Sequence, residues 1–597
     1  MKEARTIRLL LPLLRNYGWM APATILLGIV ASLAETIGLS LFVPLLQGLN
    51  GSGFEIGSGA LPNFFPAVFS HLPASNPLPY IIGLILMMTV AKSVLIFSHS
   101  VLAARMNARA THTLRSQVFA RTLSISQSQM DTIGTGRLIN LLATDTWHTS
   151  DAITLLLGLV INVCSIAVFT LLLVALSWKL TLLVVLGVVI VSAIIQIVTR
   201  AARRLGKEGV DANTTLSDHM LDALEGVREI QMFGLGRHRQ GLFDALSDRV
   251  RSIFLRLDLF HRATAPLSEL LYVSLLLGLL LAGVAAHGSI PSVIVFLLVL
   301  YRLQPQIRQV DSARLSLVSL TTSVEEVMRF LQPPAAPILD SRRFAAPLPI
   351  DFEPGEAIEF EDVSFTYDPA SEFRIEHLNI RIPLGQSSGI VGRSGSGKST
   401  LVSLLARFYE PKGGRILIGG RVLSAIDVDA WRSRIAWVSQ DAHLFRTTIR
   451  ENIRYGRLDA TDDEIVCAAK DADAHDFIRS LPDGYDTKVG SGGTDLSSGQ
   501  VQRITLARAI VRKPEILILD EATNSLDSLS EEFIRARLET MPRSHTLITI
   551  SHRLSAVRGA DHVIVLDGGR VSEQGPPSLL SRRRGFFARV KELQHAD

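Results

Sequence analysis

The chain has 597 residues, 60 Lys and Arg against 56 Asp and Glu, and a formal net charge of +4, with 48% hydrophobic and 19% charged residues. Its mean hydropathy of +0.31 excludes a disordered chain, and the length predicts several domains. The basic balance does not indicate a nucleic-acid partner, because aromatic residues make up only 6% and no segment interleaves them with basic residues. Two cysteines, Cys164 and Cys467, exclude a disulfide framework and a four-ligand zinc site. We expect both to be buried.

The first half of the chain contains six apolar runs. Each predicts a membrane-spanning helix, because about 20 apolar residues at 1.5 Å per residue cross a bilayer. The runs are residues 20–47, 80–104, 152–178, 180–199, 266–286 and 290–317. Buried helices of a soluble protein are the alternative interpretation, but such helices carry a polar stripe that these runs lack. Residues 1–330 therefore predict an all-α, six-helix transmembrane domain.

Lysine and arginine lie on one side of these runs. Residues 50–79 and 287–289 contain neither, whereas residues 105–150 and 200–262 are rich in both. Because basic loops stay in the cytoplasm, both termini are predicted to be cytoplasmic, in a multi-pass protein of the bacterial plasma (inner) membrane. Residues 5–17 predict an amphipathic helix at the membrane surface, and the N-terminus does not have the pattern of a secretory signal.

The two basic segments are also patterned as helices, so we expect them to extend the spanning helices into the cytoplasm. Glycine and short polar stretches around residues 130–136 and 222–236 predict the points at which the chain turns back.

Two charged residues fall inside the predicted spans. Glu35 and Lys92 each lie about 17 Å from the outer end of a span, at 1.5 Å per residue. A charge in the membrane is costly and normally faces a partner inside the helix bundle. We therefore predict that Glu35 and Lys92 form an ion pair, either as a structural lock or beside a substrate path. Arg302, in the sixth run, is expected either to meet an anionic head group or to face solvent.

The composition changes after residue 330. Residues 331–356 are rich in proline and predict a semi-rigid linker. From residue 357 to 597, strand-like runs alternate with helical ones, which predicts an α/β domain with a largely parallel sheet. The predicted strands are residues 358–365, 388–391, 435–438, 516–519, 546–550 and 562–566.

A phosphate-binding loop is the strongest motif in this second domain. The sequence GRSGSGKS follows a predicted strand and precedes a helical run, which is the context that a P-loop requires. Its backbone N–H groups wrap phosphates at a helix N-terminus, so the fold class is an α/β P-loop NTPase. Lys398 is expected to reach the β- and γ-phosphates, and the Ser399 hydroxyl to bind Mg²⁺. The predicted phosphate-binding residues are Gly392, Arg393, Ser394, Gly395, Ser396, Gly397, Lys398, Ser399 and Thr400.

A second motif is the apolar run of residues 516–519, which ends in two acids, Asp520 and Glu521. The carboxyl ends of parallel strands are where such sheets bind ligands. We expect Asp520 to hold Mg²⁺ through water, and Glu521 to act as the general base that polarises the attacking water.

Between these motifs, the run LSSGQ at residues 496–500 resembles the signature of the ATP-binding cassette (ABC) transporter family. Six spans before a single cassette look like an exporter-type half-transporter, similar to lipid flippases and multidrug exporters. The resemblance implies adenine stacking on Tyr367, a γ-phosphate sensor and Mg²⁺ ligand at Gln440, and a switch histidine at His552. It also implies that a second copy of the chain completes each ATP site. The remaining residues that it assigns to ATP binding are Ser497, Gly499, Gln500 and Asp527.

The sequence departs from the family pattern at three positions. Ser498 replaces a glycine of the signature, Val501 stands where a charged or amide residue is frequent, and Ser491 lies in a loop that lacks the usual glutamate. The resemblance implies that the first two tune the hydrolysis rate. The third puts in question a contact that exporters make with the membrane domain.

The function expected from these observations is ATP-driven export or flipping of an amphipathic or hydrophobic substrate (a lipid, lipid-linked glycan, peptide or drug) by a dimer. A homodimer is favoured over a heterodimer, because the chain shows no degenerate ATP site. Two alternatives remain open: an importer of a siderophore-like ligand with the exporter fold, and a non-transport membrane ATPase. The expected cofactors are ATP and Mg²⁺, the expected partner besides a second copy is membrane lipid, and no nucleic acid is expected.

Overall fold

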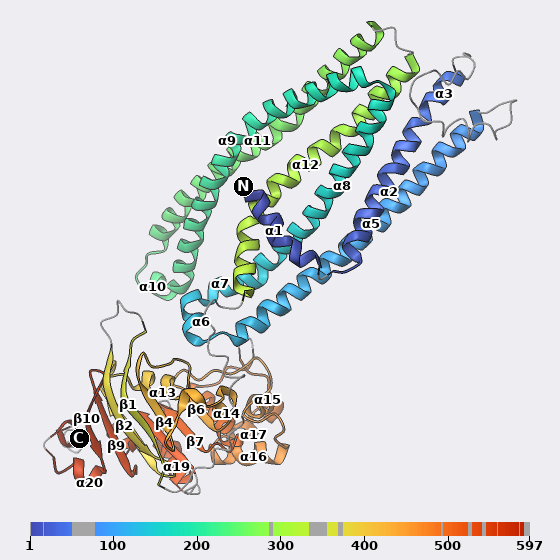
Figure 1. Cartoon of the computed structure of the whole chain (residues 1–597). Coiled ribbons are helices and arrows are strands. Elements are labelled where there is room, and N and C mark those ends of the chain that lie inside the picture. Colours follow the sequence, from blue (N-terminus) through green and yellow to red (C-terminus); the bar gives the residue numbers. More distant parts are fainter. Residues whose placement is uncertain are drawn as a thin grey trace. The chain divides into compact units, whose positions relative to one another are not determined.

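The computed structural model of the chain forms two compact units (Figure 1). The first comprises Met1–Leu123 and Gly136–Gln332, and the second comprises Ser124–Thr135 and Pro333–Asp597. The structure describes residues 2–15, 17–49, 78–285, 290–332, 355–367, 374–490, 493–522, 528–539, 545–557, 559–583 and 585–589. Most of the predicted linker, together with Ser491 and Asp527, lies outside the described residues.

The first unit consists of helices, as predicted. Its elements are α1 (Lys2–Arg15), α2 (Met20–Ser40), α3 (Phe42–Leu49), α5 (Leu78–Ser124), α7 (Thr135–Asn140), the π-helical turn η1 (Leu141–Asp145), α8 (Thr146–Leu176), α9 (Trp178–Glu225), α10 (Val227–Met232), α11 (Gly236–Ala285) and α12 (Ile290–Leu331). The predicted apolar runs fall on α2 with α3, α5, α8, α9, α11 and α12, with the boundary between the third and fourth at Ser177. Figure 1 shows α9 beside α11, and α8 beside α12.

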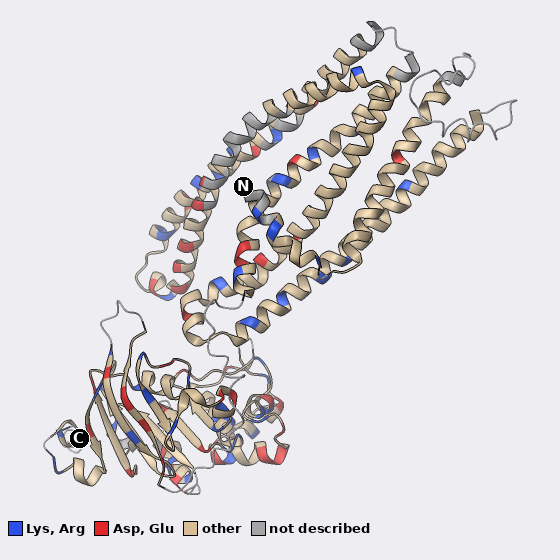
Figure 2. Cartoon of the chain, in the orientation of Figure 1, with Lys and Arg blue, Asp and Glu red and all other residues tan. Residues whose placement is uncertain are grey.

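Three stretches of the described residues are long and apolar enough to cross a membrane: Met20–Leu46, Leu78–Ser124 and Thr135–Leu176. Trp178–Val191 and Pro266–Leu281 are shorter apolar stretches. Figure 2 shows that the long helices carry their charges mainly over part of their length, while the remainder is nearly free of Lys, Arg, Asp and Glu. This distribution agrees with spanning helices that continue beyond the apolar layer.

The predicted turns between these helices are also found. The first falls at Gly134, where the left-handed backbone (φ +81°) follows the short helix α6 (Gln127–Ile133). The second falls at α10, between α9 and α11. The amphipathic N-terminal helix is α1, whose Leu10 is completely buried and which packs along α12, where Arg5 pairs with Glu325 at 2.9 Å.

Helices α2 and α8 approach each other closely. A Cβ atom on Gly28 of α2 would lie 2.6 Å from Cγ2 of Ile161 on α8, closer than van der Waals contact allows. One turn further along α2, the buried hydroxyls of Ser32 and Ser165 are hydrogen-bonded to each other. Small residues that permit such an approach are a common means of helix association in membranes, where apolar side chains gain nothing over lipid.

The second unit contains two sheets. A six-stranded sheet has the order β10-β9-β3-β8-β7-β6, in which β9, β3, β8, β7 and β6 run parallel and β10 is antiparallel. A separate antiparallel sheet has the order β2-β1-β4-β5. The strands are β1 (Ala357–Phe365), β2 (Ile375–Pro383), β3 (Ser387–Gly392), β4 (Gly413–Ile418), β5 (Arg421–Val422), β6 (Ile435–Val438), β7 (Ile516–Asp520), β8 (Thr546–Ser551), β9 (His562–Asp567) and β10 (Arg570–Gly575).

All six predicted strands are therefore present, but the prediction omitted β2, β4, β5 and β10, and with them the antiparallel sheet. The helices of this unit, besides α6, are α13 (Lys398–Leu405), η3 (Leu423–Ala425), α14 (Val428–Ser433), α15 (Ile449–Arg454), α16 (Asp462–Asp471), α17 (His475–Ser480), η4 (Gly484–Asp486), α18 (Ser498–Val511), α19 (Ser528–Glu539), η5 (Leu554–Val557) and α20 (Pro577–Leu580).

Helix α13 lies in the main core of the second unit. One cluster of buried residues joins Leu401 and Leu405 of α13 to Phe360 of the antiparallel sheet and to Ile390 and Ile518 of the parallel sheet. The fully buried Trp431 closes the end of this helix, because its Nε1 donates to the Leu405 carbonyl at 2.7 Å. The packing on both sides fixes the direction in which the N-terminus of α13 points.

The prediction that both cysteines are buried was wrong. Cys467 is exposed on α16, and Cys164 on α8 is only half-buried. A free thiol packs readily as a small apolar group, but a single cysteine in a helix carries no periodic signal that would place it on the inner face.

We predict that Gly28→Val destabilises the first unit by about 1–3 kcal/mol, the usual cost of overpacking a filled contact. The measurement is thermal unfolding of the full chain in nanodiscs. Gly278→Val on α11 is the matched control, because a Cβ there meets nothing within 4 Å, and it should have a much smaller effect. Combining Gly28→Val with Ile161→Ala should restore most of the loss. Equal destabilisation by the two glycine substitutions would contradict the close approach.

Candidate functional site

The predicted site residues gather at one edge of the parallel sheet. In the register of this sheet, Val438 of β6 pairs with Leu519 of β7, and Asp520 pairs with Ile550 of β8. The carboxyl ends of β3, β8, β7 and β6 therefore lie side by side, and the segments that follow them contain the P-loop, His552, Glu521 and Gln440. Such an edge is where parallel sheets bind ligands.

The P-loop connects β3 to α13 by a backbone that only glycine adopts easily. Gly395 and Gly397 have φ values of +77° and +101°, in the left-handed region. At Gly392, an added Cβ would lie 2.3 Å from the carbonyl oxygen of Leu566. The loop ends at the N-terminus of α13, where unpaired N–H groups and the helix dipole favour a bound phosphate.

Lys398 is bent back over this loop. Its Nζ donates to the carbonyl oxygens of Gly392 at 2.9 Å and Arg393 at 3.0 Å, and the residue is only 8% exposed. Burial lowers the pKa of this ammonium group, and the nearby carboxylates of Glu521 and Asp520 oppose the shift. The positive charge is therefore held beside the position where phosphates would bind.

Asp520 provides a buried carboxylate at the end of β7. Burial and the charge of Glu521 raise its pKa, whereas Lys398 and a hydrogen bond with Ser399 lower it. No group of three or more His, Cys, Asp or Glu side chains suited to a metal occurs among the described residues. The Ser399 hydroxyl and the Asp520 carboxylate lie within hydrogen-bond reach of each other, and hydroxyl and carboxylate oxygens are the kind of group that Mg²⁺ prefers together with substrate phosphates and water.

Glu521 has a strained backbone, with φ at +49° in a non-glycine residue. Two hydrogen bonds hold it there: its N–H donates to Ile550 at 2.9 Å, and Gln502 donates to its carbonyl oxygen at 3.3 Å. Its carboxylate Oε1 lies 2.9 Å from Nδ1 of His552. The carboxylate is 15% exposed and His552 is 48% exposed, so the pair borders solvent and is placed to orient a water and accept its proton.

The aromatic side chain predicted to stack on a base is half-exposed. Tyr367 is 48% exposed, and its hydroxyl lies 3.2 Å from the Thr400 hydroxyl on α13. The edges of its ring meet Phe365 and Tyr409, each with ring centroids 5.0 Å away. The exposed part of the ring is thus available beside the helix that follows the P-loop.

The signature residues form the start of α18. The Ser497 side chain accepts from the Gln500 N–H at 3.3 Å, and the Gln500 side chain accepts from the Ser497 N–H at 2.9 Å, which is a capping box. Ser498 stands exposed in the first turn, beside Gly499. Ser497 and Gln500 are thus hydrogen-bonded to each other. The P-loop residues Lys398 and Ser399 instead interact with Asp520, and Lys398 also with the charge of Glu521.

Some functional contacts were missed by the sequence analysis. Gln502, which holds the Glu521 carbonyl, lies two residues beyond the signature, and Tyr409, which supports Tyr367, lies four residues beyond α13. Gln440 is exposed, two residues after β6. For Gln502, the sequence offered one signal, its position two residues after the signature run LSSGQ.

The first unit contains a cluster of three charges. Nζ of Lys92 lies 2.6 Å from Oε1 of Glu35, which confirms the predicted pair. Arg302 of α12 also binds this oxygen through its Nε, a partner that the sequence analysis did not predict. The Glu35 and Lys92 side chains are 12% and 16% exposed, whereas Arg302 is 50% exposed. One carboxylate thus faces two cations, and Arg302 is the most exposed member of the cluster.

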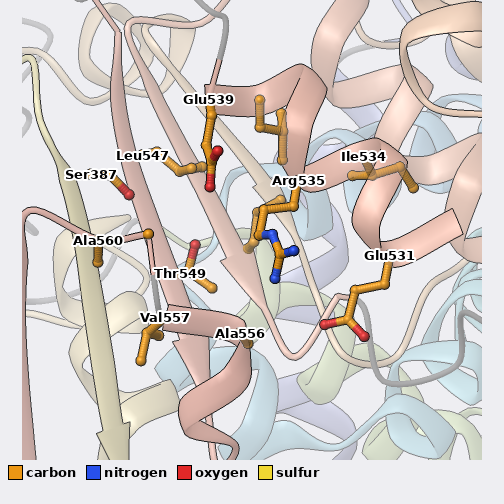
Figure 3. Close-up of a pocket in the computed structure, with 13 residues that line it drawn as sticks. Ser387, Glu531, Ile534, Arg535, Glu539, Leu547, Thr549, Ala556, Val557 and Ala560 are labelled. Atoms are coloured by element: carbon orange, nitrogen blue, oxygen red, sulfur yellow. The ribbon is translucent and has the colours of Figure 1, made fainter. Parts of the chain in front are cut away.

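A small cavity of about 50 Å³ lies between α19 and the parallel sheet (Figure 3). Arg535 and Glu531 of α19, Thr549 of β8 and Val557 of η5 contribute to its lining. This volume holds a few water molecules. None of the predicted site residues lines it, so it is separate from the P-loop edge.

Comparison with known proteins gives a consistent result. The model of the ABC transporter transmembrane region matches residues 23–304, and the ABC transporter model matches residues 375–524. An ATP-dependent lipid A-core flippase of Chromobacterium violaceum is 31% identical over 95% of this chain and 94% of its own length. A protein of the same name from Pectobacterium atrosepticum is 31% identical over 99% of this chain and 98% of its own.

Among solved structures, a bacterial Atm1-family ABC exporter with ATP bound has a TM-score of 0.79 and 25% sequence identity, over 98% of this chain and 99% of the exporter chain. These matches extend over both units and agree with the P-loop edge described above. The chain belongs to the ABC transporter family, as an ATP-hydrolysing transporter in which a membrane domain is fused to an ATP-binding domain.

Proposed function

We propose that this transporter works as a homodimer that flips or exports an amphipathic lipid with an anionic head group. The observation that carries this proposal is the cluster of Glu35, Lys92 and Arg302, which places two cations on one carboxylate and has the half-exposed Arg302 as its most exposed member. A guanidinium attracts a phosphate or carboxylate through charge-assisted hydrogen bonds, and its planar fork matches either group. The flippase names of the two relatives favour the same class of substrate.

In the proposed hydrolysis step, ATP binds with its phosphates on the P-loop and with its base on Tyr367. Lys398 leaves the Gly392 and Arg393 carbonyl oxygens and neutralises the phosphates. Glu521 accepts the proton of the water that attacks the γ-phosphorus, the bond from that phosphorus to the β–γ bridging oxygen breaks, and ADP and phosphate leave. His552 orients the Glu521 carboxylate. The short distance between Nδ1 of His552 and Oε1 of Glu521 supports the proposed role of His552 in orienting this carboxylate.

Mg²⁺ is proposed to bind between the Ser399 hydroxyl and the Asp520 carboxylate, and its charge would stabilise the developing negative charge on the phosphates. The buried position of Asp520 and its hydrogen bond with Ser399 support this assignment. Gln440 is proposed as a further ligand, because it follows β6, the strand next to β7.

The dimer is proposed because, in the part of the chain that the structure describes, the signature residues Ser497 and Gln500 are hydrogen-bonded to each other at the start of α18, away from the phosphate loop. The N-terminus of α18, with its exposed Ser498, offers a second phosphate-binding helix end. A second copy would bring that end to the ATP of the first copy, and two identical chains would form two equivalent sites. Lys and Arg are concentrated in the segments between the spans that lead toward the ATP-binding domain, which supports a location of the ATP sites on the cytoplasmic side of a bacterial inner membrane.

We predict that Glu521→Gln lowers the ATPase turnover number by about 10²-fold or more, because an amide cannot accept the proton of the attacking water. ATP binding should persist, since the phosphate loop is unchanged. Phosphate release and nucleotide binding by the full chain in nanodiscs are the measurements. Glu515→Gln is the matched control, because Glu515 precedes the opposite end of the same strand, where it pairs with Arg434. Turnover that survives in Glu521→Gln would refute the assigned base.

We also predict that Arg302→Gln weakens stimulation of the ATPase by anionic lipids about fivefold or more, because it leaves a neutral Glu35–Lys92 pair. Glu35→Gln should act in the opposite direction, since it removes the one negative charge. The measurement is the half-maximal concentration of an anionic lipid A-type glycolipid added to phosphatidylcholine nanodiscs. Arg308→Gln, at another exposed arginine of α12, is the control.

Equal responses of the Arg302 and Arg308 variants would contradict the substrate class. Flux of labelled lipid in inverted vesicles separates export from import, and stimulation without any flux would indicate a non-transport ATPase.

A further inference from the structure

A buried amide lies just over one turn inside α18, the helix that begins at the signature residues. Gln502 is 3% exposed, and its Nε2 donates to the carbonyl oxygen of Glu521 at 3.3 Å. Its Oε1 is also buried and has no hydrogen-bond partner in the described part of the chain. An unpaired buried acceptor destabilises a fold, and an apolar side chain of similar length would avoid that cost. Packing alone therefore does not explain an amide here, and the contact with Glu521 is what an apolar side chain could not make.

Two arginines fix the position of α18 around this amide. Arg503 donates to the carbonyl oxygen of Asp473 at 2.9 Å and to its carboxylate at 3.2 Å, and Ser530 of α19 donates to the same carboxylate at 2.8 Å. Further along the helix, Arg508 donates to the carbonyl oxygen of Asn452 at 2.8 Å and to its side-chain oxygen at 2.7 Å. Hydrogen bonds from a guanidinium group are strong and directional. The helix, and with it the amide, is thus held to α15 and α19.

The backbone conformation of Glu521 depends on what holds the two peptide groups beside it. With φ at +49°, it is left-handed, which a non-glycine residue keeps only where its surroundings impose it. Its N–H donates to Ile550 of β8 at 2.9 Å, and its carbonyl oxygen accepts from Gln502. The first bond orients the peptide group before the Glu521 Cα and the second orients the one after it, so together they set the direction of the side chain. That side chain ends 2.9 Å from Nδ1 of His552.

We propose that Gln502 is a positioning residue for ATP hydrolysis, which holds the Glu521 backbone so that the carboxylate stays aligned with His552 and with the attacking water. This inference rests on the proposed role of Glu521 as the general base and does not depend on which molecule is transported. Displacement of a reacting group by about 1 Å costs about 10²-fold in rate. Loss of the Gln502 contact frees the peptide group that prevents such a displacement. In this assignment Gln502 does not touch the nucleotide, and it acts on the chemical step through Glu521.

The test replaces the amide by an apolar side chain of similar length, Gln502→Met, in the full chain in nanodiscs. Phosphate release gives kcat and the KM for ATP, and nucleotide binding and thermal unfolding are measured on the same samples. We expect kcat to fall about tenfold or more while the KM for ATP changes less than about twofold, because the lost contact serves the chemical step and not binding. The unfolding temperature should change little, since the substitution removes the unpaired Oε1 together with the hydrogen bond. Gln502→Leu is measured beside it as a second side chain without a donor.

A double variant shows whether Gln502 acts through the base. In a Glu521→Gln background, the residual turnover is followed by release of labelled γ-phosphate under single-turnover conditions. There we expect Gln502→Met to lower the rate less than about twofold, since the group that it positions is already disabled. A residue with a general structural role would lower the rate by the same factor in both backgrounds.

Thr505→Val is the matched control on the same helix. The Thr505 hydroxyl is equally buried and donates to the Gln502 carbonyl oxygen at 2.8 Å, within the helix itself. The substitution keeps the shape of the side chain and removes one buried hydrogen bond that does not reach Glu521. We expect kcat of this variant to stay within about twofold of the unmodified chain.

An unchanged kcat in both Gln502→Met and Gln502→Leu would overturn the proposal, and so would an equal loss in the two backgrounds. A raised KM for ATP with an unchanged kcat would also overturn it, because the amide would then serve nucleotide binding. Turnover that survives in Glu521→Gln refutes the base itself, whereas an inactive Glu521→Gln beside a fully active Gln502→Met refutes only the positioning role. If lipids fail to stimulate the ATPase while Gln502→Met still lowers kcat, the proposed function is wrong and this inference stands.

Discussion

The enclosure of α13 between two sheets is the constraint on which the nucleotide site depends. The helix starts at Lys398, so its apolar side chains, buried against both sheets, also fix the end that faces the phosphates. Trp431 closes its far end and the turn at Arg407 directs the chain to Tyr409. The phosphate loop, the aromatic cluster of Phe365, Tyr367 and Tyr409, and the hydrogen bond that Tyr409 donates to Asp131 of α6 are therefore all attached to one rigid element, because a packed core transmits displacement and absorbs little of it.

Both charged clusters follow the same electrostatic rule, although they lie in different units. Each brings poorly solvated carboxylate and cationic side chains together, as a buried charge requires a partner. In the first unit, Glu35 is shared between Lys92 and Arg302, which leaves positive charge in excess. In the second, Asp520 and Glu521 surround Lys398, which leaves negative charge in excess where Mg²⁺ is proposed to bind. The sign of the excess is opposite in the two clusters, in keeping with the opposite charges of their proposed ligands.

The sequence predicted the features that a continuous run of residues encodes, which are the apolar spans, the central strands and the motifs that follow them. The central strands are runs of Ile, Leu and Val that are buried on both faces, and the motifs followed their ends at fixed spacing. Strand β2 alternates buried apolar residues with exposed polar ones such as Asn379 and Arg381, the pattern of a half-buried strand, whereas the prediction relied on continuous apolar runs. Gln502 and Tyr409 act through contacts with distant parts of the chain, and no local spacing encodes these. The depth of Glu35 and Lys92 in their spans was sufficient to pair them, whereas the third partner, Arg302, depends on the register of α12 against α2.

The contacts of α6 also bear on how the protein can be divided. The second unit is discontinuous in sequence, since residues 124–135 belong to it although residues 136–332 separate them from residue 333, where it resumes. A fragment that starts after the linker lacks Asp131, and the Tyr409 hydroxyl would then face solvent. Such a fragment retains the P-loop, the signature and the Glu521–His552 pair, yet it lacks one of its own surface elements. A soluble version of this unit that keeps the hydrogen bond between Tyr409 and Asp131 needs α6 to be grafted onto it or supplied as a separate peptide.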